Sequence, residues 1–585
     1  MRTRSWSLAL LPLVLFAAPA APVGYTVRTI HVATVVGPND DTRCDVAADL
    51  YLPTTASPQN PVPAILTTNG FGGAKDDATQ TATGQAFAAH GYAVLSYSGL
   101  GFGGSGCKIT LDDPDWDGKA ARQLVDYLAG LRPDTDGQRL DMIRLDGPGD
   151  PRVGMIGGSY GGQAQFALAG LDHRVDALIP LITWNDLAYS LAPNNGGTNP
   201  GVHKKEWTSL FFAEGIADGV AGAQYDPGRL IGCPNFTDAA CAAKAELDLL
   251  GYPTADTTAL ARHASVASYA ARVTAPTLLV QGQADTLFNL REAAATYRAL
   301  TAGGTPVTMI WQSWGHSHGT PAPGELELSG SGLEHTYLGQ RFLAWFDHYL
   351  KDQPVDTGPP FAYFRDWVAY TGNASTAYAG TDRYPAGQPQ PLYLSGAGDL
   401  VTSPTSVRAG SQSYANAPGG TPTSYSETSA VQGSLVPDPL TQPTDAPGTF
   451  AAWTTAPLAG DVAVVGVPTL DVRVDSPAAA LSQTTGPAGQ LVLFAKLYDV
   501  APDGSVTLPD RLVAPVRVAD VNQSVHIELP GIVHRWPAGH RLRLVLAASD
   551  AAYAGNASVL PVTVRADPGT PSVLRVPVVG PPLRA

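Results

Sequence analysis

The segment 152–162, Arg-Val-Gly-Met-Ile-Gly-Gly-Ser-Tyr-Gly-Gly, constrains the fold more than any other part of the chain. It begins as an apolar run typical of a short buried strand, and the small residues at 163–169 are typical of a helix. Between the two lies a G-x-S-x-G sequence, whose glycines at 157 and 161 leave room for closely crossing chains in a sharp turn. Such a turn lifts the Ser159 hydroxyl above the edge of a parallel sheet. The segment therefore predicts an α/β fold with an exposed serine; the alternative is a glycine-rich turn with an idle serine.

Strands and helices alternate around this turn. Apolar or alternating runs predict strands at 25–36, 45–52, 64–68, 93–97, 175–182, 276–280 and 306–311. Helical spacing of apolar side chains predicts helices at 79–90, 115–131, 290–300 and 337–350. This alternation is typical of a mainly parallel sheet covered on both faces, so we expect an α/β-hydrolase domain over residues 21–357.

Two regions depart from the α/β rhythm. Residues 184–265 contain Gly/Asn-rich turns and aromatic side chains, and we expect them to form a helical cap inserted over the sheet edge. Residues 358–585 are short alternating segments, the first at 361–370, separated by linkers rich in Pro, Gly, Ser and Thr. This pattern predicts an all-β sandwich or jelly roll at the C-terminus, and we expect a jelly roll of the galactose-binding-like kind.

The N-terminus has the pattern of an export signal. Arg2 and Arg4 precede an apolar run from Leu8 to Ala18, and the small residues at 18–20 suit a cleavage site. The run is too short to span a bilayer. We therefore expect residues 1–20 to be a signal peptide and the mature protein to be secreted; the alternative is an apolar N-terminal helix kept in the fold.

The charge limits the possible partners, and the cysteine content agrees with export. The formal net charge is −15 and no Lys/Arg cluster occurs, which argues against nucleic acid and anionic membranes as partners. None of the four cysteines forms a C-x-x-C pair, so a zinc ribbon or a thioredoxin-like site is not indicated. Proximity favours disulfides Cys44–Cys107 and Cys233–Cys241, although three pairings are possible and four buried free thiols are the alternative.

Two later loops supply partners for the serine. A serine hydroxyl is a poor nucleophile unless a base takes its proton and an acid orients that base. Asp285 follows the predicted strand 276–280, and His316 follows the predicted strand 306–311, in the Ser-Asp-His order of the hydrolases. His318 is the alternative base. The His-x-His pair also suits a metal, but no third ligand is spaced nearby, so we expect neither a metal nor a cofactor.

The remaining site residues follow from the same mechanism. The amides of Tyr160 and of Phe71, in the glycine-rich turn 69–73, are the expected donors to an oxyanion. In the cap, acids are candidates for holding a substrate ammonium, and aromatic side chains are candidates for a pocket wall. These candidates are Trp184, Asp186, Glu206, Trp207, Phe211 and Glu214. Their alternative roles are solvated surface acids and cap core.

The chain resembles the Xaa-Pro dipeptidyl-peptidase and cocaine-esterase-like (CocE/NonD, peptidase S15) serine hydrolases. The resemblance rests on the turn 157–162, on 281–288, on Gly315-His316, and on 391–395 and 539–544. It implies Ser159 as nucleophile, His316 as base and Asp285 as its orienter, with the active site where hydrolase domain, cap and jelly roll meet.

We therefore expect a secreted serine hydrolase that cleaves an ester, or an amide bond of a short peptide, through an acyl-enzyme. An Xaa-Pro dipeptidyl-peptidase is favoured over a carboxylesterase or acylase. The alternative outside this class is a catalytically inert secreted protein whose β domain binds carbohydrate.

Overall fold

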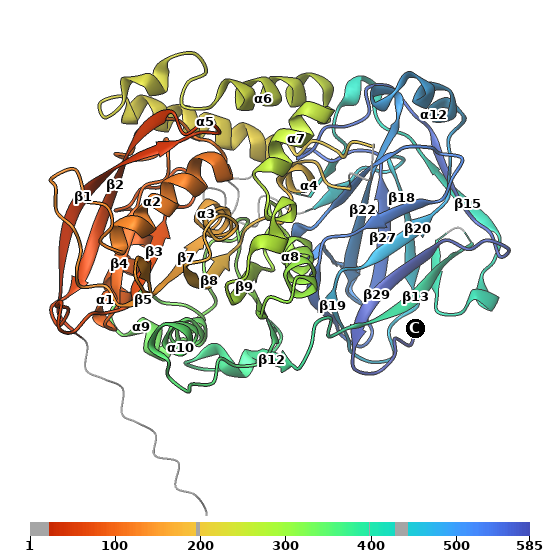
Figure 1. Ribbon diagram of the computed structural model, residues 1–585. Coiled ribbons are helices and arrows are strands. Elements are labelled where there is room, and N and C mark those ends of the chain that lie inside the picture. The colour runs from red at the N-terminus through yellow and green to blue at the C-terminus, as the bar shows by residue number, and fades with distance from the viewer. Residues whose placement is uncertain (1–22, 195–198, 397, 427–442) are drawn as a thin grey trace, which may run out of the picture.

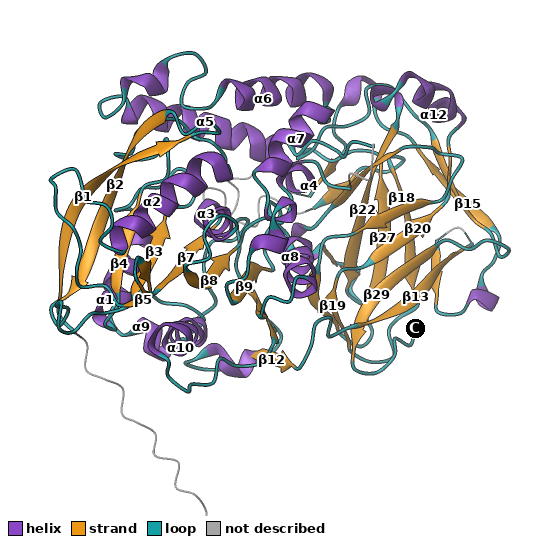
Figure 2. Cartoon of the chain, viewed as in Figure 1, coloured by secondary structure: helices purple, strands orange, loops and turns teal. Residues whose placement is uncertain are grey.

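The protein is described by a computed structural model that covers residues 23–194, 199–396, 398–426 and 443–585. The expected signal peptide, residues 1–20, lies outside the described residues. Figure 1 shows an α/β domain and a β-rich domain side by side, with helices α5, α6 and α7 above the α/β domain. The secondary structure in Figure 2 separates the mixed half from the strand-rich half.

A ten-stranded sheet forms the core of the first domain, in the order β1-β2-β4-β3-β7-β8-β9-β10-β11-β12. Pairing is parallel from β4 through β11, while β1, β2 and β12 join antiparallel. The strands are β1 Tyr25–Val36, β2 Thr42–Pro53, β3 Ala64–Thr68, β4 Ala93–Tyr97, β7 Val153–Gly158, β8 Val175–Leu181, β9 Thr277–Gly282, β10 Val307–Gln312, β11 Phe361–Phe364 and β12 Tyr378–Thr381. A short hairpin, β5 Leu145–Gly147 and β6 Asp150–Pro151, precedes β7.

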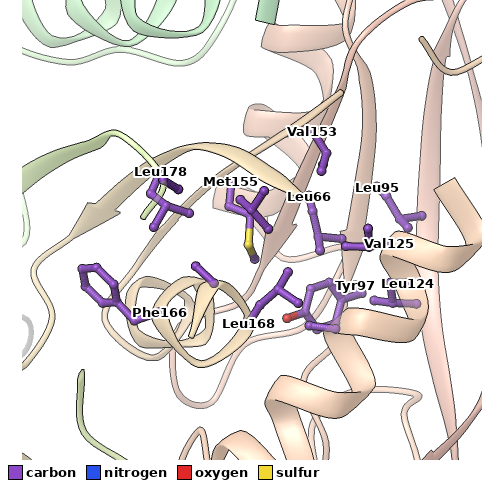
Figure 3. Close-up of a cluster of buried hydrophobic side chains, with 14 of the residues drawn as sticks. Leu66, Leu95, Tyr97, Leu124, Val125, Val153, Met155, Phe166, Leu168 and Leu178 are labelled. Carbon is purple, nitrogen blue, oxygen red and sulfur yellow. The ribbon is translucent and has the colours of Figure 1, made fainter. Parts of the chain in front are cut away.

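Helices cover both faces of this sheet. One face packs against α2 Lys119–Leu128, α3 Tyr160–Ala169 and α8 Leu290–Ala302. The other packs against α1 Ala78–Ala89 and α10 Tyr337–Lys351, and the short α9 Gly332–His335 precedes α10. In Figure 3, Met155 of β7 lies among buried side chains that include Phe166 and Leu168 of α3. Apolar strands and amphipathic helices thus close two cores around one sheet.

The cap expected at residues 184–265 is helical. It lies between β8 and β9 and contains α4 Leu187–Leu191, α5 Lys205–Gly222, α6 Asp238–Leu250 and α7 Ala255–His263. Among the helices of the described chain, none has the length and apolar composition needed to cross a bilayer.

The second domain is rich in β strands, in agreement with the expected jelly roll. Its largest sheet has twelve strands, with smaller sheets beside it. Its core contains Trp453, Trp536 and Leu544, all buried. The strands are β13 Gln388–Ser395, β14 Asp399–Val401, β15 Gly410–Tyr414, β16 Ser424–Tyr425, β17 Thr444–Asp445, β18 Phe450–Thr455, β19 Val462–Gly466, β20 Thr469–Val472, β21 Val474–Asp475, β22 Leu491–Val500, β23 Val506–Thr507, β24 Ala514–Val518, β25 Val525–Glu528, β26 Ile532–Trp536, β27 Arg541–Ala547, β28 Val562–Ala566 and β29 Val573–Val579. Between β21 and β22 lies the short helix α12 Pro477–Ser482.

The boundary expected at residues 357–358 does not match the sheet. The expected strand 361–370 ends at Phe364, and as β11 it pairs in parallel with β10. β12 then pairs with β11, so the first sheet extends to Thr381. Short alternating strands look the same in a sequence whether they extend a parallel sheet or begin a β domain, which explains the difference.

Polar contacts join the β domain to the cap and to the helix α8 beyond it. The Asn194 side chain donates to the carbonyl oxygens of Pro515 (2.8 Å) and Glu528 (3.2 Å). Arg517 donates to the carbonyls of Gly201 and Gly251 in the cap. Arg291 of α8 pairs with the Glu528 carboxylate at 2.9 Å.

Both disulfides join the pairs favoured by proximity, Cys44–Cys107 and Cys233–Cys241. The first fastens the loop after β4 to β2, and the second closes a loop within the cap.

Candidate active site

Ser159 occupies a strained turn between β7 and α3. Its backbone has φ 55° and ψ −117°, a conformation that L residues rarely adopt. The two flanking glycines are required by the crossing chains, since a Cβ at Gly157 would lie 2.7 Å from the Gly161 oxygen and a Cβ at Gly161 would lie 2.3 Å from the Thr68 oxygen. The helix begins at Tyr160, directly after the serine, rather than near residue 163 as the small-residue pattern indicated.

The structure brings Ser159, Asp285 and His316 together. His316 Nε2 lies 2.8 Å from Ser159 Oγ, and His316 Nδ1 lies 2.7 Å from Asp285 Oδ2. The other carboxylate oxygen of Asp285 accepts hydrogen bonds from the amides of Leu287 (3.0 Å) and Phe288 (2.7 Å). With an N–H donated from Nδ1 to the carboxylate, Nε2 is left to accept the serine proton.

The loops that carry the acid and the histidine are packed against each other. Gly282 and Gly315 make this possible: a Cβ at Gly282 would lie 2.2 Å from the Trp314 oxygen, and one at Gly315 would lie 2.7 Å from the Ala284 oxygen. The His316 ring also meets Phe288 edge-on at 5.2 Å between ring centroids. His318, the alternative base, is exposed, and its carbonyl accepts a hydrogen bond from Gly315.

The two expected oxyanion donors border the serine. Phe71 lies in the turn after β3, where a Cβ at the neighbouring Gly70 would be 4.0 Å from Ser159 Cβ. The Tyr160 amide is at the N-terminus of α3. Within the described residues, neither amide donates a hydrogen bond to another protein atom. Both are therefore available to a ligand.

Two buried carboxyls beneath the turn have no counterpart in the sequence analysis. The Tyr160 hydroxyl accepts a hydrogen bond from the Asp112 amide (3.0 Å) and contacts Asp117 Oδ2 (3.4 Å). Burial raises the pKa of Asp117 to about 7, partly offset by a hydrogen bond from Thr110, and raises that of Asp112 well above its ordinary value. The sequence pattern does not identify them, because acidic residues at the start of a helix such as the predicted 115–131 are normally exposed to solvent.

A cavity of about 120 Å³ opens beside Ser159, between the turn and the cap. Its aromatic lining comprises Phe71, Tyr160, Trp184, Phe211, Phe212, Phe236 and Phe288, and its leucines are 111, 187, 191, 247 and 260. No Asp or Glu is among the described residues of the lining. Its one charged member, Lys244, pairs with Asp248 on the same helix. The pocket therefore presents an apolar surface to a substrate.

The candidate cap residues divide between the pocket and its surroundings. Trp184 and Phe211 line the cavity, as expected of a pocket wall. Trp207 does not line it, but its ring lies 6.0 Å from the His316 ring and its indole N–H donates to Thr286 (3.1 Å).

Two of the three acids among these candidates, Asp186 and Glu206, lie away from the cavity. Asp186 caps α4 by accepting from the Ala188 amide (2.9 Å) and pairs with Arg262 (3.3 Å). Glu206 borders a separate surface hollow with Lys205 and Asp248. Neither is placed to hold a substrate ammonium beside Ser159. Which face of a cap helix meets the active site depends on tertiary packing, which the sequence pattern does not specify.

Glu214, the third acid, lies next to the glycine-rich turn 69–73. A Cβ at Gly72 would be 2.2 Å from Glu214 Oε1, so the carboxyl is in contact with that glycine. Burial raises the pKa of Glu214. It lies on α5, three residues after Phe211, which lines the cavity, but is not itself among the lining residues.

Two family models match the chain. The model described as X-Pro dipeptidyl-peptidase (S15 family) matches residues 41–318. The model described as the X-Pro dipeptidyl-peptidase C-terminal non-catalytic domain matches residues 372–558. Together they span most of the chain, in the order of its two domains. No curated protein sequence gives a significant match.

Solved structures share the fold over nearly the full length. An aminopeptidase from a marine sediment archaeon, Thaumarchaeota archaeon, is 15% identical with a TM-score of 0.62, and the match covers 98% of this chain and 99% of that one. An alpha-amino acid ester hydrolase is 17% identical with a TM-score of 0.63, over 97% of this chain and 99% of that one. A CocE/NonD family hydrolase from Staphylococcus aureus is 14% identical with a TM-score of 0.60, over 94% and 96%.

Such low identities establish the fold alone, whereas the two family models establish descent. The chain belongs to the X-Pro dipeptidyl-peptidase (S15) family of hydrolases.

Proposed function

We propose that this hydrolase is a serine enzyme that works through an acyl-enzyme. The observation that carries the proposal is the His316 ring, which contacts Ser159 Oγ through one nitrogen and Asp285 through the other. In this arrangement His316 takes the serine proton as Ser159 attacks a carbonyl, and Asp285 holds the ring in the required tautomer.

The amides of Tyr160 and Phe71 stabilise the oxyanion that forms on attack. His316 then protonates the leaving group, and a water molecule activated by the same ring releases the acyl group. Fluorophosphonate labelling separates this proposal from an inert binding protein, since only an activated serine reacts. The chemistry requires no cofactor.

The preferred substrate class that we propose is an ester with an apolar acyl group. A pocket lined by aromatic rings and leucines stabilises hydrocarbon, at roughly 25 cal/mol per Å² of apolar surface buried. It offers no carboxylate to an ammonium, which would cost several kcal/mol to leave unpaired in such surroundings. The apolar lining therefore favours the esterase over a peptidase that binds a free N-terminus within the pocket.

A second candidate, cleavage of aminoacyl or Xaa-Pro peptide substrates, is favoured by Glu214 and by family membership. Glu214 contacts Gly72 in the glycine-rich turn 69–73, which carries Phe71. In the described part of the chain, Glu214 has no hydrogen bond or ion pair with another residue. Such a carboxylate is available to a substrate ammonium at the pocket rim.

A panel of chromogenic esters and aminoacyl-prolyl anilides distinguishes the two candidates. The esterase predicts rapid cleavage of uncharged esters, with no advantage from a free amine. The peptidase predicts cleavage of alanyl-prolyl-anilide, a loss on N-acetylation of about 2–4 kcal/mol in kcat/KM, and removal of that difference by Glu214→Gln. Glu206→Gln is the matched control, because Glu206 lies on the same helix but outside the pocket.

Export is also part of the proposal. The basic and apolar N-terminal pattern supports cleavage near residue 20, and the two disulfides suit an oxidising compartment. N-terminal sequencing of the protein from the culture medium tests this, and an intact Arg2 to Ala20 segment there would contradict it.

A further inference from the structure

Three ligand-type side chains from two parts of the fold meet at the edge of the cap. His263 is the last residue of α7. Asp115 lies in the turn of π-helix at Pro114–Gly118, before α2, and Asp113 is the residue that caps this turn. One donor atom of each lies within 4.8 Å of the other two, and the described residues contain no second group of this kind. The cluster is distant in sequence from Ser159 and has no part in the proposed hydrolysis.

The spacing of the cluster suits a metal ion better than hydrogen bonding. His263 Nε2 lies 3.3 Å from Asp113 Oδ1 and 3.3 Å from Asp115 Oδ2. Both distances are longer than an ordinary N–H···O bond. Ligands about 2.1 Å from a tetrahedral Zn²⁺ are separated by roughly 3.4 Å. The two distances from the imidazole nitrogen are therefore close to the ligand separation of a tetrahedral zinc site, and the two carboxylate oxygens lie within 4.8 Å of each other. Asp113 Oδ1 also accepts a hydrogen bond from the Asp115 amide at 2.7 Å, which fixes the position of that carboxylate.

The chemistry of the donors narrows the class of cation. One imidazole and two carboxylates suit Zn²⁺ and its neighbours in the first transition row, whereas Ca²⁺ and Mg²⁺ favour all-oxygen sites. Solvent reaches the cluster, because the His263 side chain is 52% exposed. Lys119 approaches the other oxygen of Asp115 at 3.4 Å, but Asp40 shares that lysine at 2.9 Å. The positive charge of Lys119 near the cluster is therefore partly neutralised by Asp40.

The position of the cluster gives such an ion a structural consequence. α7 contributes Thr257, Leu260 and Ala261 to the wall of the apolar cavity. His263 follows this wall directly, and its partners belong to the α/β domain. An ion held by all three residues would fasten the end of the pocket-forming helix to the body that carries the serine.

We propose that Asp113, Asp115 and His263 form a binding site for a divalent transition-metal ion of the Zn²⁺ class, which clamps the cap to the α/β domain. The site adds a metal-dependent fastening at the cap, independent of the hydrolytic reaction.

Calorimetric titration of the chelator-treated full chain with ZnCl₂ tests the site, with thermal unfolding and hydrogen exchange of α7 as further readouts. One equivalent should bind, raise Tm and slow exchange in α7, while CaCl₂ at the same concentration does neither. His263→Ala and Asp115→Asn should each weaken binding at least about tenfold. His526→Ala is the matched control, because His526 is an exposed histidine paired with a single carboxylate, Asp471.

Retention of full affinity in both His263→Ala and Asp115→Asn would overturn the proposal, as would absence of Zn²⁺ binding in the unaltered protein. An equal loss in His526→Ala would also overturn it, since the ion would then bind elsewhere. If Zn²⁺ binds but hydrogen exchange in α7 is not slowed, the proposal that the ion clamps the cap to the α/β domain is wrong.

Discussion

The two sides of Ser159 are built in opposite ways. On the α/β side, polar groups are paired: Asp285 accepts from the Leu287 and Phe288 amides and contacts His316, which in turn contacts the serine. On the cap side, the serine faces aromatic rings and leucines, and hydrogen-bonding partners for a substrate are scarce. On the α/β side, directional hydrogen bonds fix the positions of the side chains. On the cap side, a substrate would be held by apolar contact.

This difference separates reaction from selection. Hydrogen bonds fix atoms to within a few tenths of an ångström, as proton transfer requires. Apolar contact tolerates substrates of similar shape and discriminates by about 0.8 kcal/mol for each buried CH₂. We expect substitutions on the α/β side to change the rate for every substrate, and substitutions in the cap to change the ranking of substrates.

The largest effect is expected from Ser159→Ala. Loss of the nucleophile should lower kcat by about 10³-fold or more for every substrate and abolish fluorophosphonate labelling. The hydroxyl is not part of the core, so circular dichroism and Tm should stay near those of the unaltered protein. Labelling at the original level in this variant would place the reactive serine elsewhere.

His316→Ala should be nearly as damaging, because members of a triad act as a unit. His318→Ala is the matched control two residues away, and its exposed side chain predicts little loss. The measurement is kcat/KM for one good ester across the three proteins. A larger loss in His318→Ala would exchange the two roles.

The cap side should respond to acyl length. Each CH₂ that enters the cavity should raise kcat/KM about fourfold along a series of p-nitrophenyl esters, until the cavity is filled. Leu260→Trp narrows the pocket, so it should lower activity on the longer esters by about 10–100-fold while sparing the acetate. Leu249→Trp, at an 83% exposed position on α6, is the control. A flat length series in the unaltered enzyme would contradict an acyl pocket.

The smallest effect on activity is expected from Asp117→Asn, which instead changes how stability depends on pH. Burial raises the folded-state pKa of Asp117 to about 7. The folded protein therefore keeps a proton that the unfolded chain releases above about pH 4. This contribution to stability is complete below pH 4 and is lost as pH rises through 7.

Urea unfolding of both proteins at pH 5 and pH 8 measures this contribution. The unaltered protein should lose more stability between the two values than Asp117→Asn does. Equal losses in both proteins would show that Asp117 does not bind a proton in this window.

Much of the α/β side could be predicted because its determinants are local. Glycine at 157 and 161 follows from chain crossings, and the loops carrying Asp285 and His316 each begin where a predicted strand ends. These rules do not depend on how distant elements pack. The contact of the three side chains is a geometric finding, and their catalytic roles stay predictions until the variants are measured.

The cap side resisted prediction because it depends on helix orientation. Glu206 and Phe211 lie on the same helix, yet Phe211 faces the cavity and Glu206 borders a separate hollow. The buried pair Asp112 and Asp117 was missed for a related reason, since acids are normally exposed and burial is set by residues far away in the chain. The assignment of β11 to the first sheet likewise required a pairing partner that sequence did not identify.

The contacts made by Asn194, Arg517 and Glu528 have a consequence for protein engineering. Some of the contacts between the β domain and the cap are side chains that donate to backbone carbonyls, and an ion pair between Arg291 and Glu528 links the β domain to α8. In a chimera that takes its β domain from a relative, the contacts that support the cap, and with it the pocket beside Ser159, would therefore change. The design of such a chimera therefore has to preserve the contacts of Asn194, Arg517 and Glu528, in addition to the linker where the two sequences are joined.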